Sequence, residues 1–152
     1  MKRLILALAV VPTLLLAAEL ENSTIAKLRA RAEQGVAGAQ FNLAEMYASG
    51  YGVPKDPTVA ATWYQKSAEQ GYGEAEFTYA MACLEGRGRP KDPVEGLAWV
   101  IVAAKAGGAS LVKFRDQLEQ QFGPEGSAAA QKRSRELLAL IDTHKRAKTE
   151  GR

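Results

Sequence analysis

The sequence predicts an all-α solenoid, an α/α stack of helix–loop–helix repeats. Residues 32–67 and 68–103 match each other at a shift of 36 positions without a gap, and 14 of these 36 positions are identical. A fixed period of this length is typical of repeat proteins, in which each unit buries its apolar face against its neighbours. No stretch of appreciable length has the alternation of a β-strand. The short connections between the expected helices favour antiparallel neighbours.

The chain begins with a segment that has the order of a secretory signal peptide. Lys2 and Arg3 precede an apolar run over 4–18, which is shorter than the roughly 20 residues of a membrane-spanning helix. A cut after Ala18 places Leu16 where a small residue is preferred, so an uncleaved anchor is the alternative. We expect a periplasmic or secreted protein of a Gram-negative bacterium, without a membrane span after cleavage. Removing this segment lowers the net charge from +3 to +1, which does not indicate a nucleic acid partner.

The rest of the chain divides into units of one repeat. A half-repeat at 19–35 starts the stack, with Asn22 or Ser23 as the cap of its helix and Gly35 at its end. The other units are a repeat at 36–71, a repeat at 72–107, a degenerate capping repeat at 108–147 and a tail at 148–152 that we expect to fray.

The first full repeat contains two expected helices joined by a Gly-x-Gly loop. A helix over about 37–49 leads into the loop at 50–52, whose glycines allow positive φ angles. Asp56 and Pro57 then begin the second helix, because Asp is a favourable N-cap and Pro is favourable at the first helical position. That helix is expected to end near Gln70.

The second full repeat follows the same plan. Its first helix is expected over about 73–85 with Phe77 facing inward, and its second begins at Asp92, where Glu95 completes a capping-box pattern. Trp63 and Trp99 occupy matching positions and are expected to be buried between repeats.

The capping repeat departs from the period. A helix over about 109–122 is expected, followed by a break at Gly123 and a longer helix that ends near Arg146. Atypical terminal units with a polar outer face keep solenoids soluble.

The repeat resembles the Sel1-like repeat, a relative of the tetratricopeptide repeat with a longer connection. The resemblance rests on Ala39-Gln40-x-x-Leu43-Ala44-x-x-Tyr47-x-x-Gly50-x-Gly52-Val53-x-x-Asp56 and on Ala60-x-x-Trp63-Tyr64-x-Lys66-Ser67-Ala68-x-x-Gly71. It implies a right-handed superhelix in which the first helix of each pair lines a concave, protein-binding groove. It also implies an adaptor without catalytic activity and without a cofactor.

The expected binding residues are the outward positions of these first helices, which differ between the two copies, and two tyrosines on turns. Repeats agree where packing dictates the residue, so a ligand face is expected to differ between copies, as any solvated face also would. Glu45, Glu76 and Glu85 would favour a partner with some positive charge. The full set is Gln40, Asn42, Glu45, Met46, Ser49, Tyr51, Tyr72, Glu76, Thr78, Met81 and Glu85, with Ala82 on the same face.

The sequence contains no complete catalytic or metal-binding set. Ser110 and Lys113 fit the Ser-x-x-Lys pattern of penicillin-binding enzymes, but the companion motifs are missing. His144 is the only histidine and lies beside basic residues at a helix end, where a cation is favoured. Cys83 is the only cysteine, so it has no internal disulfide partner, and its position indicates a buried apolar role.

Three functions remain open at this point. The favoured one is an exported, non-catalytic adaptor that binds a protein or peptide in the cell envelope through its concave groove. The second is an immunity or inhibitor protein that neutralises an exported toxin. The third is an enzyme acting on cell-wall or β-lactam substrates through Ser110 and Lys113. No small-molecule substrate, metal or cofactor is expected for the adaptor.

Overall fold

The computed structural model describes residues 23–151, and all regular structure in this range is helical. Residues 23–33 form the first described helix. The helices that follow are α2 (Ala37–Ser49), α3 (Pro57–Ala68), α4 (Gly73–Glu85), α5 (Pro93–Ala104) and α6 (Ala109–Glu150). The predicted all-α solenoid is confirmed. The predicted signal peptide at 1–18 lies outside the described residues.

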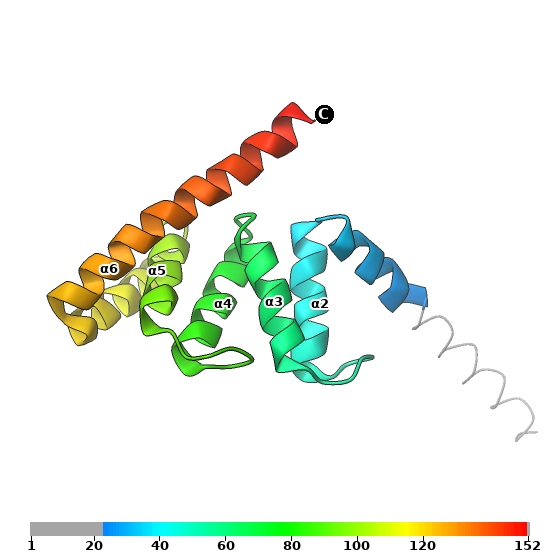
Figure 1. Cartoon of the computed structure of the whole chain (residues 1–152), viewed down its shortest axis with the longest axis horizontal. Coiled ribbons are helices and arrows are strands. Elements are labelled where there is room, and N and C mark those ends of the chain that lie inside the picture. The colour runs from blue at the N-terminus through cyan, green and yellow to red at the C-terminus, as the bar shows by residue number, and fades with distance from the viewer. Residues whose placement is uncertain (1–22, 152) are drawn as a thin grey trace, which may run out of the picture.

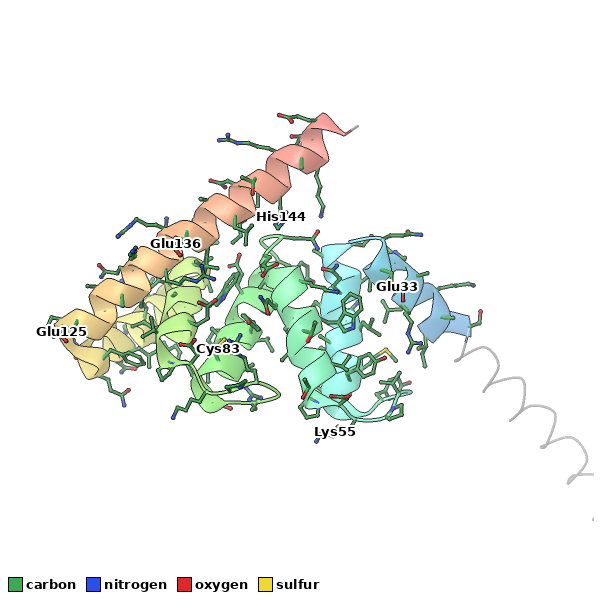
Figure 2. All side chains as sticks on the ribbon, viewed as in Figure 1. Glu33, Lys55, Cys83, Glu125, Glu136 and His144 are labelled. Atoms are coloured by element: carbon green, nitrogen blue, oxygen red, sulfur yellow. The ribbon has the colours of Figure 1, made fainter. Side chains whose placement is uncertain are left out.

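The helices pack as consecutive antiparallel pairs, and α6 then turns back along the stack (Figure 1). Gly123 divides α6 into two segments, because its φ of 68° and ψ of −178° are not helical. The first segment (109–122) continues the order of the stack. The second segment (124–150) runs back across the end of α3 and the start of α4, where His144 approaches Glu69 (Figures 1 and 2).

The second segment is longer than its apolar pattern predicts. It continues beyond Arg146 to Glu150, and Lys148 Nζ donates a hydrogen bond to Gln70 Oε1. His144 Nδ1 lies 2.7 Å from the carbonyl oxygen of Glu69, to which it donates. Polar contacts with the first full repeat, rather than apolar periodicity, therefore accompany the end of this helix. The helix therefore continues past Arg146, where the sequence predicts its end, into the segment at 148–152 that is expected to fray.

The predicted helix starts are confirmed at both Asp-Pro pairs. The side chain of Asp56 accepts hydrogen bonds from the backbone amides of Thr58 and Val59, each at 3.0 Å. Asp92 accepts from the amide of Glu95 at 3.0 Å. The capping box is not completed, however, because the carboxylate of Glu95 bonds Trp99 Nε1 at 3.0 Å instead of returning to the cap.

A continuous core joins the two full repeats and α6. Trp99, Leu97 and Val100 of α5 are fully buried and pack with Leu137 and Ile141 of α6. A smaller cluster joins the helix over 23–33 to α2, through Ala32, Ala39 and Leu43. The stack is therefore sealed by an apolar helix face at both ends, as a solenoid requires.

No helix in the range 23–151 combines the length and the apolar character needed to cross a membrane.

Candidate protein-binding groove

A groove lies between α4 and the first segment of α6, with the end of α5 at its base. It consists of two adjoining cavities of about 580 Å³ and about 550 Å³ that share Phe114. We call it the α4–α6 groove. Its main lining residues are Glu74, Glu76, Phe77, Met81 and Leu84 from α4, Lys91 and Pro93 after it, Ala103 and Ala106 near the end of α5, and Ser110, Leu111, Phe114, Leu118 and Phe122 from α6.

Helical spacing produces this lining. Phe77, Met81 and Leu84 are three or four residues apart, so they form one stripe along α4. Leu111, Phe114 and Leu118 form the facing stripe on α6 by the same rule, with Phe122 one turn further on. The rings of Phe77 and Phe114 meet edge to face, with centroids 6.2 Å apart.

Phe77 is the exposed aromatic residue of the groove. Its position in the repeat predicts an inward side chain, but 38% of the surface of Phe77 remains accessible. The matching residue of the first repeat, Phe41, packs against Tyr64 and Tyr72, with centroids 5.7 and 5.4 Å apart. Phe77 lacks equivalents of these two neighbours, because Val100 and Gly108 stand at the matching positions.

One end of the groove is acidic. Glu74 is exposed, whereas only 7% of the surface of Glu76 is accessible. Burial raises the pKa of Glu76, and the positive charge of Lys145 counteracts part of this shift. The opposite end carries the exposed ammonium group of Lys91.

The structure divides the predicted binding residues of α4 among different surroundings. Met81 and Glu76 line the groove. Thr78 lines another cavity of about 330 Å³, where α4 meets the first repeat. Glu85 lies 2.6 Å from Arg87 in an exposed ion pair. Only part of the expected surface is therefore brought together.

Several predicted residues of the first repeat are engaged in contacts within the protein. Gln40 is only 5% exposed, and its amide donates to the carbonyl of Ala32 at 3.1 Å. Glu45 accepts from the hydroxyl of Tyr64 at 2.5 Å. Tyr72 packs on Phe41. The outward assignment of Gln40 and Glu76 was wrong because the second segment of α6 and the neighbouring helices cover positions that face solvent on an isolated helix.

The remaining predicted residues lie away from the groove. Asn42, Ser49 and Tyr51 are exposed, and Met46 is partly buried next to Gly52. None of these four lines the α4–α6 groove.

Sequence reasoning missed the groove residues Phe77, Leu84, Leu111 and Phe114. Their apolar spacing was visible, but it was interpreted as packing. An amphipathic stripe does not show whether a neighbouring element covers it, so the apolar spacing could not distinguish a buried face from the wall of a groove.

The structure places Ser110 and Lys113 of the candidate catalytic pair in different surroundings. Ser110 lies at the rim of the groove, and Lys113 is exposed. Within residues 23–151 their side chains form no hydrogen bond with each other. Cys83 is buried, and burial raises its thiol pKa to about 12, so the reactive thiolate is disfavoured. The described residues contain no cluster of metal-ligating side chains.

The fold and the groove define an α-solenoid repeat protein, and comparisons with known proteins identify its class of repeat. The sequence model of the Sel1 repeat matches residues 37–72 and 73–108. A Sel1 repeat protein from Oxalobacter formigenes is 36% identical, with a TM-score of 0.56; the match covers 59% of this chain and 68% of that one. The chain belongs to the Sel1 repeat family, which confirms the resemblance.

A second solved structure covers more of the chain. It is c5321, a protective antigen present in uropathogenic Escherichia coli strains that displays an SLR fold, with 26% identity and a TM-score of 0.72. The match covers 84% of this chain but only 27% of c5321. No curated protein matches the sequence. Sel1 repeats generally serve as non-catalytic scaffolds that mediate protein interactions.

Proposed function

We propose that this chain is an exported, non-catalytic adaptor that binds a segment of another protein in the α4–α6 groove. The observation that carries the proposal is the exposed Phe77 ring beside Phe114 in an apolar groove. Contiguous apolar surface framed by polar residues marks interaction sites on soluble proteins. Aromatic residues in such positions are frequent anchors of binding energy.

The dimensions of the groove suit a short segment. From Gly73 to Leu84, α4 rises about 17 Å. This length accommodates about three turns of a helix or about five residues of extended chain. The apolar stripes on its two walls fit a segment with apolar residues on one face, which is a common mode of peptide recognition.

Photo-crosslinking from inside the groove tests this function. A photoreactive phenylalanine analogue replaces Phe77 in one variant and Leu140 in a matched control. These residues have nearly equal exposure, 38% and 37%, but Leu140 lies outside the groove. We expect a distinct crosslinked protein from envelope extract at position 77 and not at position 140, and we expect Met81→Asp to abolish it.

The helical circular dichroism of Met81→Asp should match that of the original protein, so that loss of the crosslink reports on the groove. Equal crosslinking from positions 77 and 140, or a crosslink that survives Met81→Asp, would contradict the assignment.

Export is a separate part of the proposal and rests on the sequence of residues 1–18. Expression of the full chain with a C-terminal tag in a Gram-negative host should place it in the periplasmic fraction or the medium. Mass spectrometry should show loss of about 18 residues. Retention of the unprocessed chain in the cytoplasm would overturn the proposed location while leaving the groove unaffected.

A further inference from the structure

The three glutamates expected to favour a positively charged partner, Glu45, Glu76 and Glu85, make different contacts in the folded protein. Glu45 accepts a hydrogen bond from Tyr64, and Glu85 forms an ion pair with Arg87. The carboxylate of Glu76 has neither a hydrogen bond nor an ion pair among residues 23–151. It is nevertheless the most buried of the three, with 7% of its surface accessible.

A buried carboxylate without a partner is costly, because burial disfavours its charged form. Burial accordingly raises the pKa of Glu76. Among the described residues, Arg89 Nε is the fully buried side-chain polar atom that lacks a hydrogen-bond partner. The oxygens of Glu76 also lack a partner but are not in that class, so they are not sealed in the protein interior. Glu76 lines the cavity of about 580 Å³ in the groove. The carboxylate is therefore open to a group that enters this cavity.

The surroundings of Glu76 define the complementary group. Glu74 lies two residues before Glu76 on α4 and lines the same cavity; it is exposed and forms no ion pair in the described structure. Phe77 and Phe114 provide an apolar surface in the same cavity. Lys145 is the cation whose charge reaches Glu76, but it does not form an ion pair with it. The site offers negative charge next to aromatic rings.

We propose that the acidic end of the groove holds a lysine or arginine side chain of the bound segment, with its carboxylate contact at Glu76 and a second charge at Glu74. The aliphatic stem of such a side chain packs on the rings of Phe77 and Phe114, while its charged head reaches the carboxylates. The preceding or following apolar residue of the segment fills the rest of the cavity. This inference rests on the proposed function and specifies that the groove selects a segment with a basic residue.

Two synthetic peptides of about ten residues, long enough to follow one side of α4, provide the test. Both carry leucines at helical spacing, and they differ only in having lysine or glutamine beside the terminal leucine. Titration of the full chain by fluorescence anisotropy should show that the lysine peptide binds at least about fivefold more tightly.

Glu76→Gln should remove the preference for lysine. The matched control is Glu125→Gln, which removes one negative charge from an exposed position at the bend of α6 that does not line the groove (Figure 2). The control should keep the preference. Lys145→Gln should strengthen binding of the lysine peptide, because it removes a competing positive charge near Glu76.

The outcomes separate this inference from the proposed function. Equal binding of the two peptides, or a preference that survives Glu76→Gln, would overturn the basic-residue site while crosslinking at Phe77 still supports the groove. Binding of neither peptide would also overturn it. If peptide binding is lost under conditions in which the ultracentrifuge shows dimers, the groove would be assigned to a second copy of the chain. This outcome would also overturn the basic-residue site.

Discussion

Trp63 and Trp99 stand at the same position of the two repeats, but their surroundings differ. Trp99 is 1% exposed, and its indole Nε1 donates to Glu95, which also accepts from Arg133 of α6. Trp63 is only partly buried, and the ammonium of Lys66 lies 4.3 Å from the centre of its ring. The difference arises because α6 packs over α5, whereas the short helix over 23–33 covers less of the first repeat.

Phe41 and Phe77 show the reverse. Phe41 in the first repeat is covered by two tyrosines, whereas Phe77 in the second is open to the groove. The repeat pattern thus determines which residues point toward a neighbour, and the order of the stack determines how completely that neighbour covers them. A binding site is expected where neighbouring helices leave an apolar residue exposed.

The largest expected effect is the loss of the better buried tryptophan. Trp99→Ala should lower the free energy of unfolding by about 3–5 kcal/mol, because it leaves a cavity in the core. Trp63→Ala should cost about 1–2 kcal/mol, since part of its ring is already accessible. Urea unfolding followed by circular dichroism measures both.

Tyr51→Ala serves as the control, since Tyr51 is 67% exposed and its removal should change stability by less than about 0.5 kcal/mol. A larger loss for Trp63→Ala than for Trp99→Ala would show that the first repeat carries the core.

The two matching loop glycines should differ as well. Both have positive φ, 67° at Gly52 and 70° at Gly88. A Cβ at Gly88 would lie 1.9 Å from the backbone oxygen of Pro57, whereas at Gly52 the nearest atom belongs to the flexible side chain of Ile25. Gly88→Ala should cost about 2–4 kcal/mol, from strain and overlap together, and Gly52→Ala about 1–2 kcal/mol.

Thermal unfolding of the two glycine variants provides the measurement. Equal losses would mean that the close approach of Gly88 to the start of α3, which Gly52 does not share, does not contribute.

The junction between α5 and α6 should depend on Arg133. Its Nε lies 2.7 Å from Glu95 Oε2, and the hydrogen bond with Glu95 is the main cause of its raised pKa. Arg133→Met should lower stability by about 1–2 kcal/mol, a range limited by solvent screening because the guanidinium is partly exposed. Arg135→Met, at an exposed neighbouring position, should have little effect, and similar losses in both would contradict a specific role for the Glu95 contact.

The smallest effect distinguishes Tyr64 from Val100, which occupies its position in the second repeat. Burial, together with the hydrogen bond to Glu45, raises the pKa of Tyr64. The unfolded chain loses this proton near pH 10 while the folded protein keeps it, so stability should fall as pH rises above about 10. Tyr64→Phe should reduce this loss by about 1 kcal/mol between about pH 9 and about pH 11.

Urea titrations at the two pH values measure the alkaline loss. An unchanged loss in Tyr64→Phe would show that other groups cause it.

Most of the fold could be predicted because its signals are local. Gly50 and Gly86 end their helices in the left-handed conformation, and Asp56 and Asp92 cap the next ones. Each of these acts within a few residues, so sequence spacing is sufficient to locate them. The start of α6 at Ala109 and its break at Gly123 could be predicted for the same reason.

The site was harder to predict from the sequence, because it depends on contacts between distant residues. Glu76 and Gln40 are outward positions on their own helices, yet both are buried. Glu95 belongs to a capping pattern, yet it bonds Trp99 and Arg133, which is 38 residues away. Periodicity identifies a face of a helix but not the element that covers it.

By itself the sequence determined the class of the protein: a Sel1 repeat solenoid whose helix starts, turns and apolar stripes recur every 36 residues. This was possible because caps and turns act locally and each repeat packs only on its neighbours. The tertiary structure alone decided that Phe77 remains open beside Phe114 and that Glu76 is buried without a hydrogen-bond or ion-pair partner among residues 23–151. Those properties depend on where α6 lies, and its path is set by packing across the whole stack.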